Sequence, residues 1–135
     1  MIVDSSAIVA ILRAEPEQAR FTKIIATAGR ARLSAASYLE TAIVIDHARD
    51  PVISRAFDSF LAASAIDIEA VTPEQARIAR DAYRDFGKGS GHAAQLNFGD
   101  CLTYAQAKAR GEPLLFKGED FVHTDLEAAV DASPP

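Results

Sequence analysis

The sequence predicts an α/β sandwich built around a mainly parallel sheet. Two short stretches, residues 1–4 and 113–116, are almost continuously apolar, which is typical of strands buried on both faces of a parallel sheet. Longer stretches with apolar residues at helical spacing alternate with the strands, and prolines and glycines separate them. Such alternation indicates helices packed on a parallel sheet, in which ligands bind outside the carboxyl ends of the strands.

The first half of the chain is predicted to contain two strands and four helices. Pro16 and Pro51 each suit the first turn of a helix, where the missing N–H of proline leaves no hydrogen bond unmade. The stretch 36–48 carries apolar residues at helical spacing, including Leu39 and Ile43, and is predicted to form a buried helix. In order, the elements are a strand over 1–4, helices over 5–14 and 16–29, a weak strand over 31–35, the helix over 36–48 and a helix from Pro51.

The second half begins with a strand over 66–71, where apolar and polar residues alternate with a period of two. Thr72 then caps a helix, and Gln75 completes a predicted capping box with it. The remaining elements are a helix from Pro73 to Phe86, a glycine-rich loop over 87–92, a helix over 97–111 with Gly111 as its stop, a strand over 113–116 and a sharp turn over 117–121.

The composition is that of a soluble globular domain. Of the 135 residues, 49% are hydrophobic and 24% are charged, which predicts a single domain over 1–131 with a frayed tail over 132–135. No apolar run approaches the roughly 20 residues of a membrane helix, and the first residues lack the basic start of a signal peptide. The single cysteine, Cys101, fits a reducing cytosol, so a cytoplasmic location without membrane contact is expected.

The net charge of −5 argues against broad, sequence-independent binding of nucleic acid, for which a basic surface is expected. The charge does not exclude an enzyme that acts on nucleic acid with the help of a metal, because a cluster of acids that binds divalent cations lowers the formal charge of the bare chain. Composition therefore does not decide whether the protein acts on nucleic acid.

Four carboxylates are predicted to meet at one edge of the sheet. Asp4 ends the first strand, and Asp120 lies just past the end of the last one. Asp100 lies in the first turn of a helix, and Glu40 lies one to two turns into the helix that follows the second strand. Carboxylates this close repel each other, and burial increases the repulsion. A divalent cation removes the conflict, and oxygen ligands of this kind suit Mg²⁺ or Mn²⁺.

Three of these acids also have ordinary structural interpretations. Asp4 is a favourable cap for the helix that follows it. Glu40 could close a capping box with Ser37, although it shares its helical face with apolar residues and would need a partner there. Asp100 could lie behind an Asn97 cap, where the helix dipole favours a carboxylate. The agreement of the four acids on one edge favours the metal site over these separate explanations.

Other positions have two interpretations each. Asp120 could be a turn residue, with Glu119 or Asp125 in its functional place. Ser6 could hydrogen-bond a metal-bound carboxylate or water, or it could cap a helix. Lys88 could contact a phosphate or be an ordinary solvated charge. Cys101 is interpreted as a small packed residue, since the sequence shows no histidine placed as its base.

Four motifs, MIVDSSAIVAIL, SYLETAIVI, NFGDCLTYAQAKA and LLFKGEDFVHTD, resemble the PIN-domain family, and within it the VapC toxins of bacterial toxin–antitoxin modules. They occur in the family's order and cover nearly the whole chain, although the region 49–96 matches only in general character. The resemblance implies a three-layer α/β/α sandwich, Mg²⁺- or Mn²⁺-dependent endoribonuclease activity, a homodimer, and a cognate antitoxin that blocks the active site. Carried onto this chain, the family's acidic set is Asp4, Glu40, Asp100 and Asp120.

The mechanism expected from this resemblance has one or two Mg²⁺ ions held by Asp4, Asp100 and Asp120. Glu40 either binds metal directly or orients a water molecule, and the metal activates that water for in-line attack on the phosphate. The resemblance does not extend to substrate contacts. From the sequence itself, contacts to the RNA backbone are expected from Lys88, His92 and Lys117, and Ser6 is a further candidate for substrate binding.

Two other functions and the mode of assembly complete the expectations. An aspartyl-phosphate enzyme would use Asp4 as nucleophile, but such enzymes usually carry a second acid at the position where Ser6 stands. A PIN-like binding module without activity is the other alternative, and the intact acidic set argues against it. Apolar helical residues beyond what one sheet can cover predict a homodimer, and the acidic site predicts an inhibitor that inserts an arginine. The apolar residues concerned are Ile8, Leu12, Phe57, Phe60 and Leu61.

Overall fold

A computed structural model of the chain describes residues 1–129. Its centre is a four-stranded sheet in the order β3-β2-β1-β4, and every neighbouring pair of strands is parallel. The predicted parallel sheet is confirmed, whereas the predicted domain end at 131 and the tail over 132–135 lie outside the described residues. The strands are β1 (Ile2–Val3), β2 (Arg32–Ser34), β3 (Asp67–Glu69) and β4 (Leu114–Leu115).

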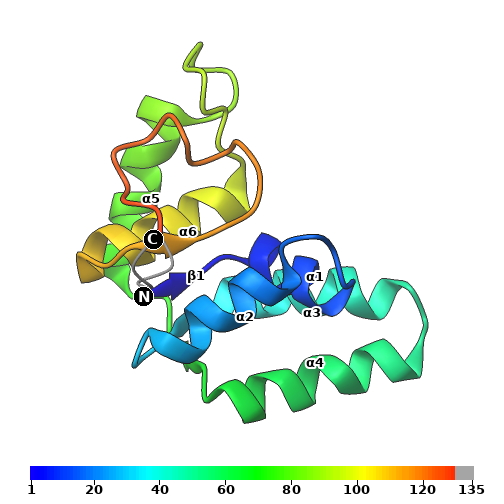
Figure 1. Cartoon of the computed structure of the whole chain (residues 1–135). Helices are drawn as coiled ribbons and strands as arrows, with labels where there is room; N and C mark the ends of the chain where they lie inside the picture. Colours follow the sequence, from blue (N-terminus) through cyan, green and yellow to red (C-terminus); the bar gives the residue numbers. More distant parts are fainter. Residues whose placement is uncertain (130–135) are drawn as a thin grey trace.

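Helices cover both faces of the sheet, so the fold has the three layers expected (Figure 1). Successive residues of a strand point to opposite faces, and Ile2 and Val3 accordingly belong to two different buried cores. The core around Ile2 lies under α5 (Pro73–Phe86) and α6 (Phe98–Arg110). The core around Val3 lies under the other helices, which are α1 (Ser5–Leu12), α2 (Gln18–Thr27), α3 (Ala35–His47) and α4 (Pro51–Ser64).

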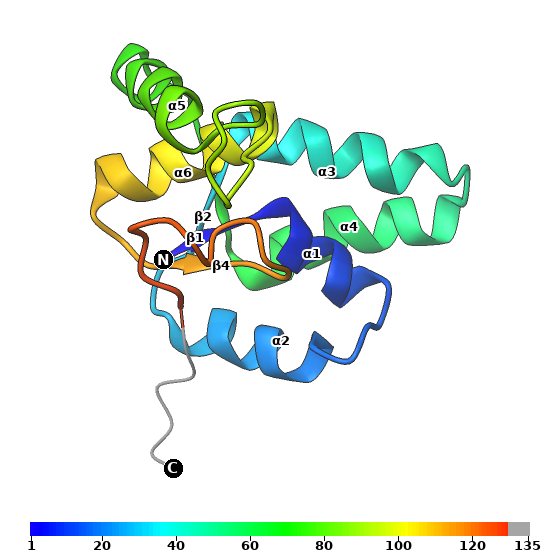
Figure 2. The same ribbon diagram turned by 90° about the horizontal axis from the view of Figure 1, so that it is seen from above.

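Helices α3 and α4 form an antiparallel pair that extends beyond the sheet (Figure 2). The prediction that α3 is buried is wrong for its aliphatic face, because Leu39 and Ile43 are 59% and 60% exposed. The covered face instead carries Ser37, Thr41 and Ile45. Periodicity identified one side of the helix as apolar, but the neighbouring helices pack against the other side.

Two of the predicted helix boundaries have the expected chemistry. Gly111 ends α6 in the left-handed conformation, with φ of 64°, which glycine adopts without strain. The Thr72 side chain accepts a hydrogen bond from the backbone N–H of Gln75 at 3.1 Å. The predicted capping box is only half formed, because the Gln75 side chain donates to Glu69.

Two of the five side chains on which the sequence argument for a dimer rests are buried within the chain itself. Ile8 is fully buried and Phe57 is 2% exposed, because both pack into the core around Val3. Large apolar side chains that are exposed lie elsewhere, and the most exposed of them are Phe98 and Val52. Within residues 1–129, no helix combines the length and apolar character needed to cross a membrane.

Candidate functional site

Asp4 follows β1 directly and is held by two hydrogen bonds. Its Oδ2 accepts from the backbone N–H of Ser6 at 3.0 Å, so Asp4 does cap α1. Its Oδ1 accepts from the Thr103 hydroxyl at 2.9 Å, and Ser37 Oγ lies 3.1 Å from the same hydroxyl oxygen. Since the Thr103 proton goes to Asp4, Ser37 is the donor of that second bond. The capping interpretation is therefore correct, and it fixes the buried carboxylate at the carboxyl edge of the sheet.

Asp100 lies in the first turn of α6 and forms a complete capping box with Asn97. Its Oδ2 accepts from the backbone N–H of Asn97 at 3.1 Å. Burial raises the pKa of Asp100 to about 7, in spite of this bond, and the charges of Asp120, Asp4 and Glu40 raise it further. The other three predicted acids therefore lie close enough for their charges to act on Asp100. We call Asp4, Glu40, Asp100 and Asp120 the acidic cluster.

Glu40 reaches the cluster from α3. The Ser5 hydroxyl donates to its Oε1 at 2.7 Å, and the carboxylate lies against Gly99 in the first turn of α6. The alternative in which Glu40 closes a capping box with Ser37 is wrong, because the cap of α3 is Ser34, whose side chain accepts from the backbone N–H of Ala36. Glu40 is thus directed at α1 and α6 and not at the start of its own helix.

The choice between Asp120 and Asp125 depends on a basic neighbour. Asp125 accepts hydrogen bonds from Lys108 at 2.5 Å and from the Tyr104 hydroxyl at 2.6 Å, and these two partners lower its pKa. Asp120 is exposed in the loop after β4, and it is the acid whose charge acts on Asp100. The geometry therefore favours Asp120 as the fourth acid.

The acidic cluster fits a divalent cation by its donor type, since all of its side chains offer hard oxygen ligands. No described Lys, Arg or His forms an ion pair with any of its four carboxylates. Within residues 1–129, no three His, Cys, Asp or Glu side chains are already arranged around a common metal position. Binding would therefore have to draw the carboxylates closer together.

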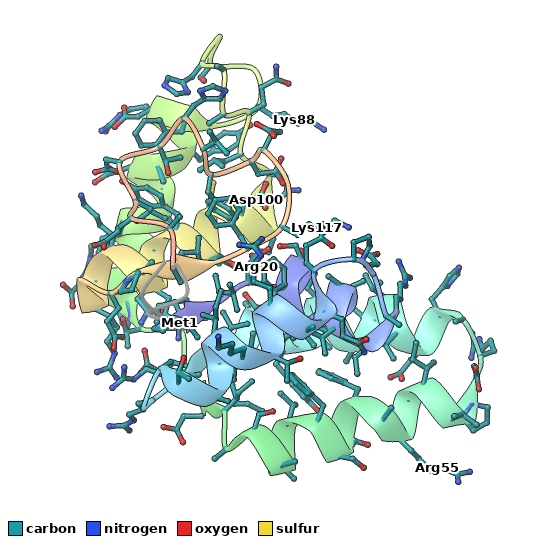
Figure 3. All side chains as sticks on the ribbon, viewed as in Figure 1. Met1, Arg20, Arg55, Lys88, Asp100 and Lys117 are labelled. Atoms are coloured by element: carbon teal, nitrogen blue, oxygen red, sulfur yellow. The ribbon has the colours of Figure 1, made fainter. Side chains whose placement is uncertain are left out.

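The residues proposed to contact RNA lie in different surroundings. Lys88 is exposed on the glycine-rich loop that leads toward α6, and Figure 3 shows it on the same side of the ribbon as Asp100. His92 packs its ring edge on Phe86 at 4.9 Å between centroids, and its Nδ1 accepts from the backbone N–H of Ala94. His92 therefore also stabilises the loop itself.

Ser6 and Lys117 connect the loop after β4 to α1. The Ser6 hydroxyl accepts from the backbone N–H of Lys117 at 3.0 Å. The Lys117 ammonium pairs with Glu15 at 2.5 Å and with Glu17 at 3.2 Å, and these partners raise its pKa. The Ser6 bond therefore holds the backbone of the loop after β4 against α1. The charge of Lys117 is paired with the two glutamates that lie between α1 and α2.

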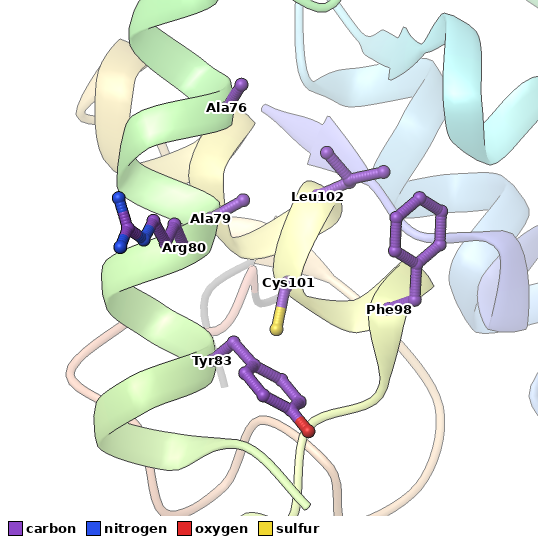
Figure 4. A pocket seen from close by; sticks show the side chains of 7 residues that line it. All are labelled: Ala76, Ala79, Arg80, Tyr83, Phe98, Cys101 and Leu102. Carbon is purple, nitrogen blue, oxygen red and sulfur yellow. The ribbon is translucent and has the colours of Figure 1, made fainter.

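A groove of about 420 Å³ lies between α5 and α6 (Figure 4). Phe98 stands at its rim and is 81% exposed, although it is only two residues from Asp100. Burial and the charge of Asp100 raise the pKa of the Cys101 thiol to about 11, which agrees with its interpretation as a packed residue. The groove is lined by Ala76, Ala79, Arg80, Tyr83, Phe98, Cys101 and Leu102.

Sequence reasoning missed the residues that support the acids. Thr103 follows Asp100 by three positions and Ser37 precedes Glu40 by three, so each lies on the same helical side as an acid. That spacing was the available signal. Ser5 and Gly99 contact Glu40 from other segments of the chain, and nothing local indicates those contacts.

Comparisons with known proteins identify the family of the chain. The profile of the PIN domain matches residues 1–127. Ribonuclease VapC28 of Mycobacterium tuberculosis is 59% identical over 131 residues, which are 97% of this chain and 98% of the relative. Ribonuclease VapC30 of the same species is 48% identical over 126 residues, or 93% of this chain and 95% of that one.

Solved structures show the same fold. The M. tuberculosis toxin VapC20, described as cleaving the sarcin–ricin loop, superposes with a TM-score of 0.73 at 16% identity and 98% coverage of both chains. A chain of a toxin–antitoxin complex from Klebsiella pneumoniae superposes with a TM-score of 0.65 at 12% identity and 92% coverage of both. With its fold, its acidic edge and relatives that match along almost their entire length, this chain belongs to the PIN domain family.

Proposed function

We propose that this protein is a VapC-type endoribonuclease that hydrolyses RNA at the acidic cluster with the help of Mg²⁺ or Mn²⁺. The observation that carries the proposal is the gathering of four acids from four separate segments, with no basic side chain paired to them within residues 1–129. Its relatives are named as VapC ribonucleases, at up to 59% identity over nearly the whole chain. A bound divalent cation would stabilise charge on the phosphate and lower the pKa of an attacking water molecule.

The residues of the cluster differ in how firmly they are held. Asp4 and Asp100 accept backbone or hydroxyl hydrogen bonds and are buried, so they offer preorganised ligand oxygens. Glu40 is held by Ser5 through Oε1, which leaves Oε2 to bind the metal or orient water. Asp120, which lies on an exposed loop and whose charge acts on Asp100, would complete the set.

The structure offers little support for an aspartyl-phosphate enzyme. Asp4 is only 4% exposed and already accepts a hydrogen bond at each oxygen, so the attacking oxygen would have to reach the phosphate in competition with one of these bonds. Ser6, where such enzymes carry a second acid, is bound to the backbone of Lys117. We therefore keep hydrolysis as the proposed reaction.

We propose Lys88 as the principal contact to the RNA backbone among the predicted cations. It is exposed on a loop with several glycines that leads toward α6, the helix that carries Asp100. Lys117 would have to leave Glu15 and Glu17 to bind a phosphate, and His92 would have to leave the Phe86 ring. We assign Ser6, His92 and Lys117 a secondary part in substrate binding.

We also propose that the protein forms a homodimer through the groove between α5 and α6. A protruding Phe98 and an apolar groove occur on the same face, and a two-fold axis could place the ring of each copy in the groove of the other.

We further propose that an antitoxin blocks the acidic cluster with an arginine, so excess Mn²⁺ should weaken the binding of the antitoxin. RNA as the substrate and a protonated Cys101 thiol both fit a cytoplasmic location.

Cleavage assays with metal-free protein test the proposed reaction. Full-length protein should cleave RNA after Mg²⁺ or Mn²⁺ is added, and it should be inactive in excess chelator. Asp58→Asn, which removes an exposed carboxylate on α4, should leave cleavage unchanged. Cleavage that continues in chelator by protein confirmed to be metal-free would contradict the proposal, and absence of cleavage with every metal would favour the idle binding module.

Light scattering tests the proposed dimer. Wild-type protein should have the mass of a dimer at micromolar concentration, and Phe98→Ser should shift it toward the monomer. Val52→Ser is the matched control, because Val52 is 73% exposed on α4, away from the groove. A monomeric wild type, or a Phe98→Ser variant that remains a dimer, would exclude this interface.

A further inference from the structure

The carboxylate of Glu40 occupies the place where a side chain at position 99 would lie. A Cβ built on Gly99 would overlap Glu40 Oε2 and would lie 2.9 Å from its carboxyl carbon and 3.1 Å from Oε1. These three atoms are the nearest neighbours that such a Cβ would meet, and all belong to the end of one flexible side chain. The space beside Gly99 is therefore filled by the Glu40 carboxylate and not by backbone.

The backbone at position 99 does not itself require glycine. Gly99 is the second residue of α6, and it is not among the residues with positive φ. In a helix, glycine is less stable than alanine by roughly 0.5 to 1 kcal/mol. Helix stability would therefore be better served by alanine here, and the contact with Glu40 is the remaining reason for glycine.

We infer that Gly99 is a positioning residue, whose missing side chain allows the Glu40 carboxylate to approach the first turn of α6 beside Asp100. Ser5 holds Glu40 Oε1 from the opposite side at 2.7 Å, so the carboxylate is confined between α1 and α6. The inference rests on the proposed function, because it assigns Gly99 a part in the same metal site.

Adding a methyl group at this position should change where Glu40 lies more than how stable the fold is. The atoms in the way are at the end of a side chain with three rotatable bonds, and they can swing outward while the helix stays in place. Swinging outward takes the carboxylate away from Asp100 and breaks its alignment with Ser5. Stability and metal binding are therefore predicted to change in opposite directions.

The test uses Gly99→Ala in the full chain, with Mn²⁺ as the probe. The variant should melt at the same temperature as the wild type or higher, and calorimetry on metal-free protein should show roughly tenfold weaker Mn²⁺ binding. RNA cleavage should fall by a similar or larger factor. A variant that melts lower, or that binds Mn²⁺ as the wild type does, would overturn the inference.

Glu40→Ala provides the background that separates positioning from a general structural effect. If Gly99 acts only through Glu40, adding Gly99→Ala to Glu40→Ala should cause no further loss of Mn²⁺ affinity. An equal loss in both backgrounds would mean that the methyl group disturbs α6 itself and would contradict the assignment.

A crystal structure of metal-free Gly99→Ala gives a readout that does not depend on activity. The Glu40 carboxylate should have moved while the α6 backbone has not. A shifted α6 with Glu40 in place would overturn the inference even if cleavage were lost. Wild-type protein that binds no Mn²⁺ would overturn the proposed function and the role of Gly99 in it. The crystal structure of the metal-free variant would still show whether the Gly99→Ala substitution displaces Glu40.

Discussion

Acids gather at two places around the same sheet, and their surroundings are opposite. Near the amino ends of the strands, Arg32 binds Glu112, and the N-terminal amine of Met1 lies 3.2 Å from the same carboxylate. Arg110 binds Glu69, the last residue of the edge strand β3, and Glu69 also lies 3.8 Å from Arg32. We call these five residues the paired cluster. At the carboxyl ends, the acidic cluster has no such basic partners among the described residues.

The pKa values follow this difference. Although partial burial acts to raise the pKa of Glu112, hydrogen bonds from the N-terminal amine and Arg32 hold it below its usual range. The pKa of Glu69 is lowered chiefly by its bond from Arg110. Asp100, buried among other acids, has its pKa raised to about 7. The acids of the paired cluster are thus held in their charged form by basic partners, whereas burial and neighbouring acids work against the charged form of Asp100.

The largest expected effect comes from removing one charge from the acidic cluster. Asp100→Asn should lower RNA cleavage about a thousandfold, because a buried charged ligand next to the reacting phosphate is lost. Asn can still accept the bond from the Asn97 backbone, so the fold should persist. Circular dichroism would check the fold, and a variant with wild-type activity would remove Asp100 from the site.

Removing a charge from the paired cluster should affect stability instead. Arg32→Leu removes one of the two cations bound to the partly buried Glu112 and should lower the free energy of unfolding by about 1 to 3 kcal/mol. Mn²⁺ affinity of the folded protein should be unchanged, because the altered residue lies at the other edge of the sheet. Urea unfolding and calorimetry measure the two quantities. Loss of Mn²⁺ affinity in folded Arg32→Leu would contradict the separation of the clusters.

The pH dependence of stability should reveal the acidic cluster in metal-free protein. Unfolded Asp100 releases its proton near pH 3.8, whereas the folded state retains it until about pH 7. The folded state binds more protons between these values, so its stability falls as the pH rises, by about 2 kcal/mol between about pH 5 and pH 7.5. Asp100→Asn should be more stable than the wild type at the higher pH and should lack this slope. Parallel pH curves for both proteins would contradict the raised pKa.

The supporting hydroxyls should have a smaller effect. Thr103→Val removes the bond to Asp4 and leaves the Ser37 hydroxyl without its acceptor, which should destabilise the protein by about 1 to 2 kcal/mol. Asp4 then loses one of its two fixed contacts, so Mn²⁺ affinity should fall about tenfold. Thermal melting and calorimetry are the measurements. If Thr103→Val is less stable but binds Mn²⁺ as tightly as the wild type does, the hydroxyl supports the core and not the metal site.

The smallest expected effect concerns the RNA backbone. Lys88→Ala should weaken RNA binding and reduce the slope of log affinity against log salt by about one, since one phosphate contact is lost. Mn²⁺ affinity should not change, because Lys88 is not a ligand. Equal affinity and equal salt slope for both proteins would show that Lys88 is an ordinary solvated charge.

Much of the acidic cluster was predictable because its signals are local. Asp4 at a strand end and Asp100 in a first helical turn are recognisable within a few residues. The contact of Glu40 with Ser5 joins residues 35 positions apart, and the choice of Asp120 over Asp125 depends on the side chain of Lys108. Such contacts are set by tertiary packing, which no short window of sequence contains.

The fold shows the same limit. The parallel sheet and most element positions followed from hydrophobic runs and from proline and glycine positions. The burial of α3 was predicted wrongly, because periodicity identifies an apolar face without saying whether a neighbour covers it. Leu39 and Ile43 are exposed since α4 and α6 pack on the side that carries Ser37 and Ile45.

The central claim, that the acidic cluster is a divalent-cation site, is tested most directly by anomalous scattering from crystals soaked in Mn²⁺. We predict one or two peaks at the carboxyl edge of the sheet, bound by carboxylate oxygens of Asp4 and Asp100, with Glu40 or Asp120 in contact. A saturating soak that leaves this edge without a peak, or that places Mn²⁺ only at acids outside the cluster, would contradict the claim.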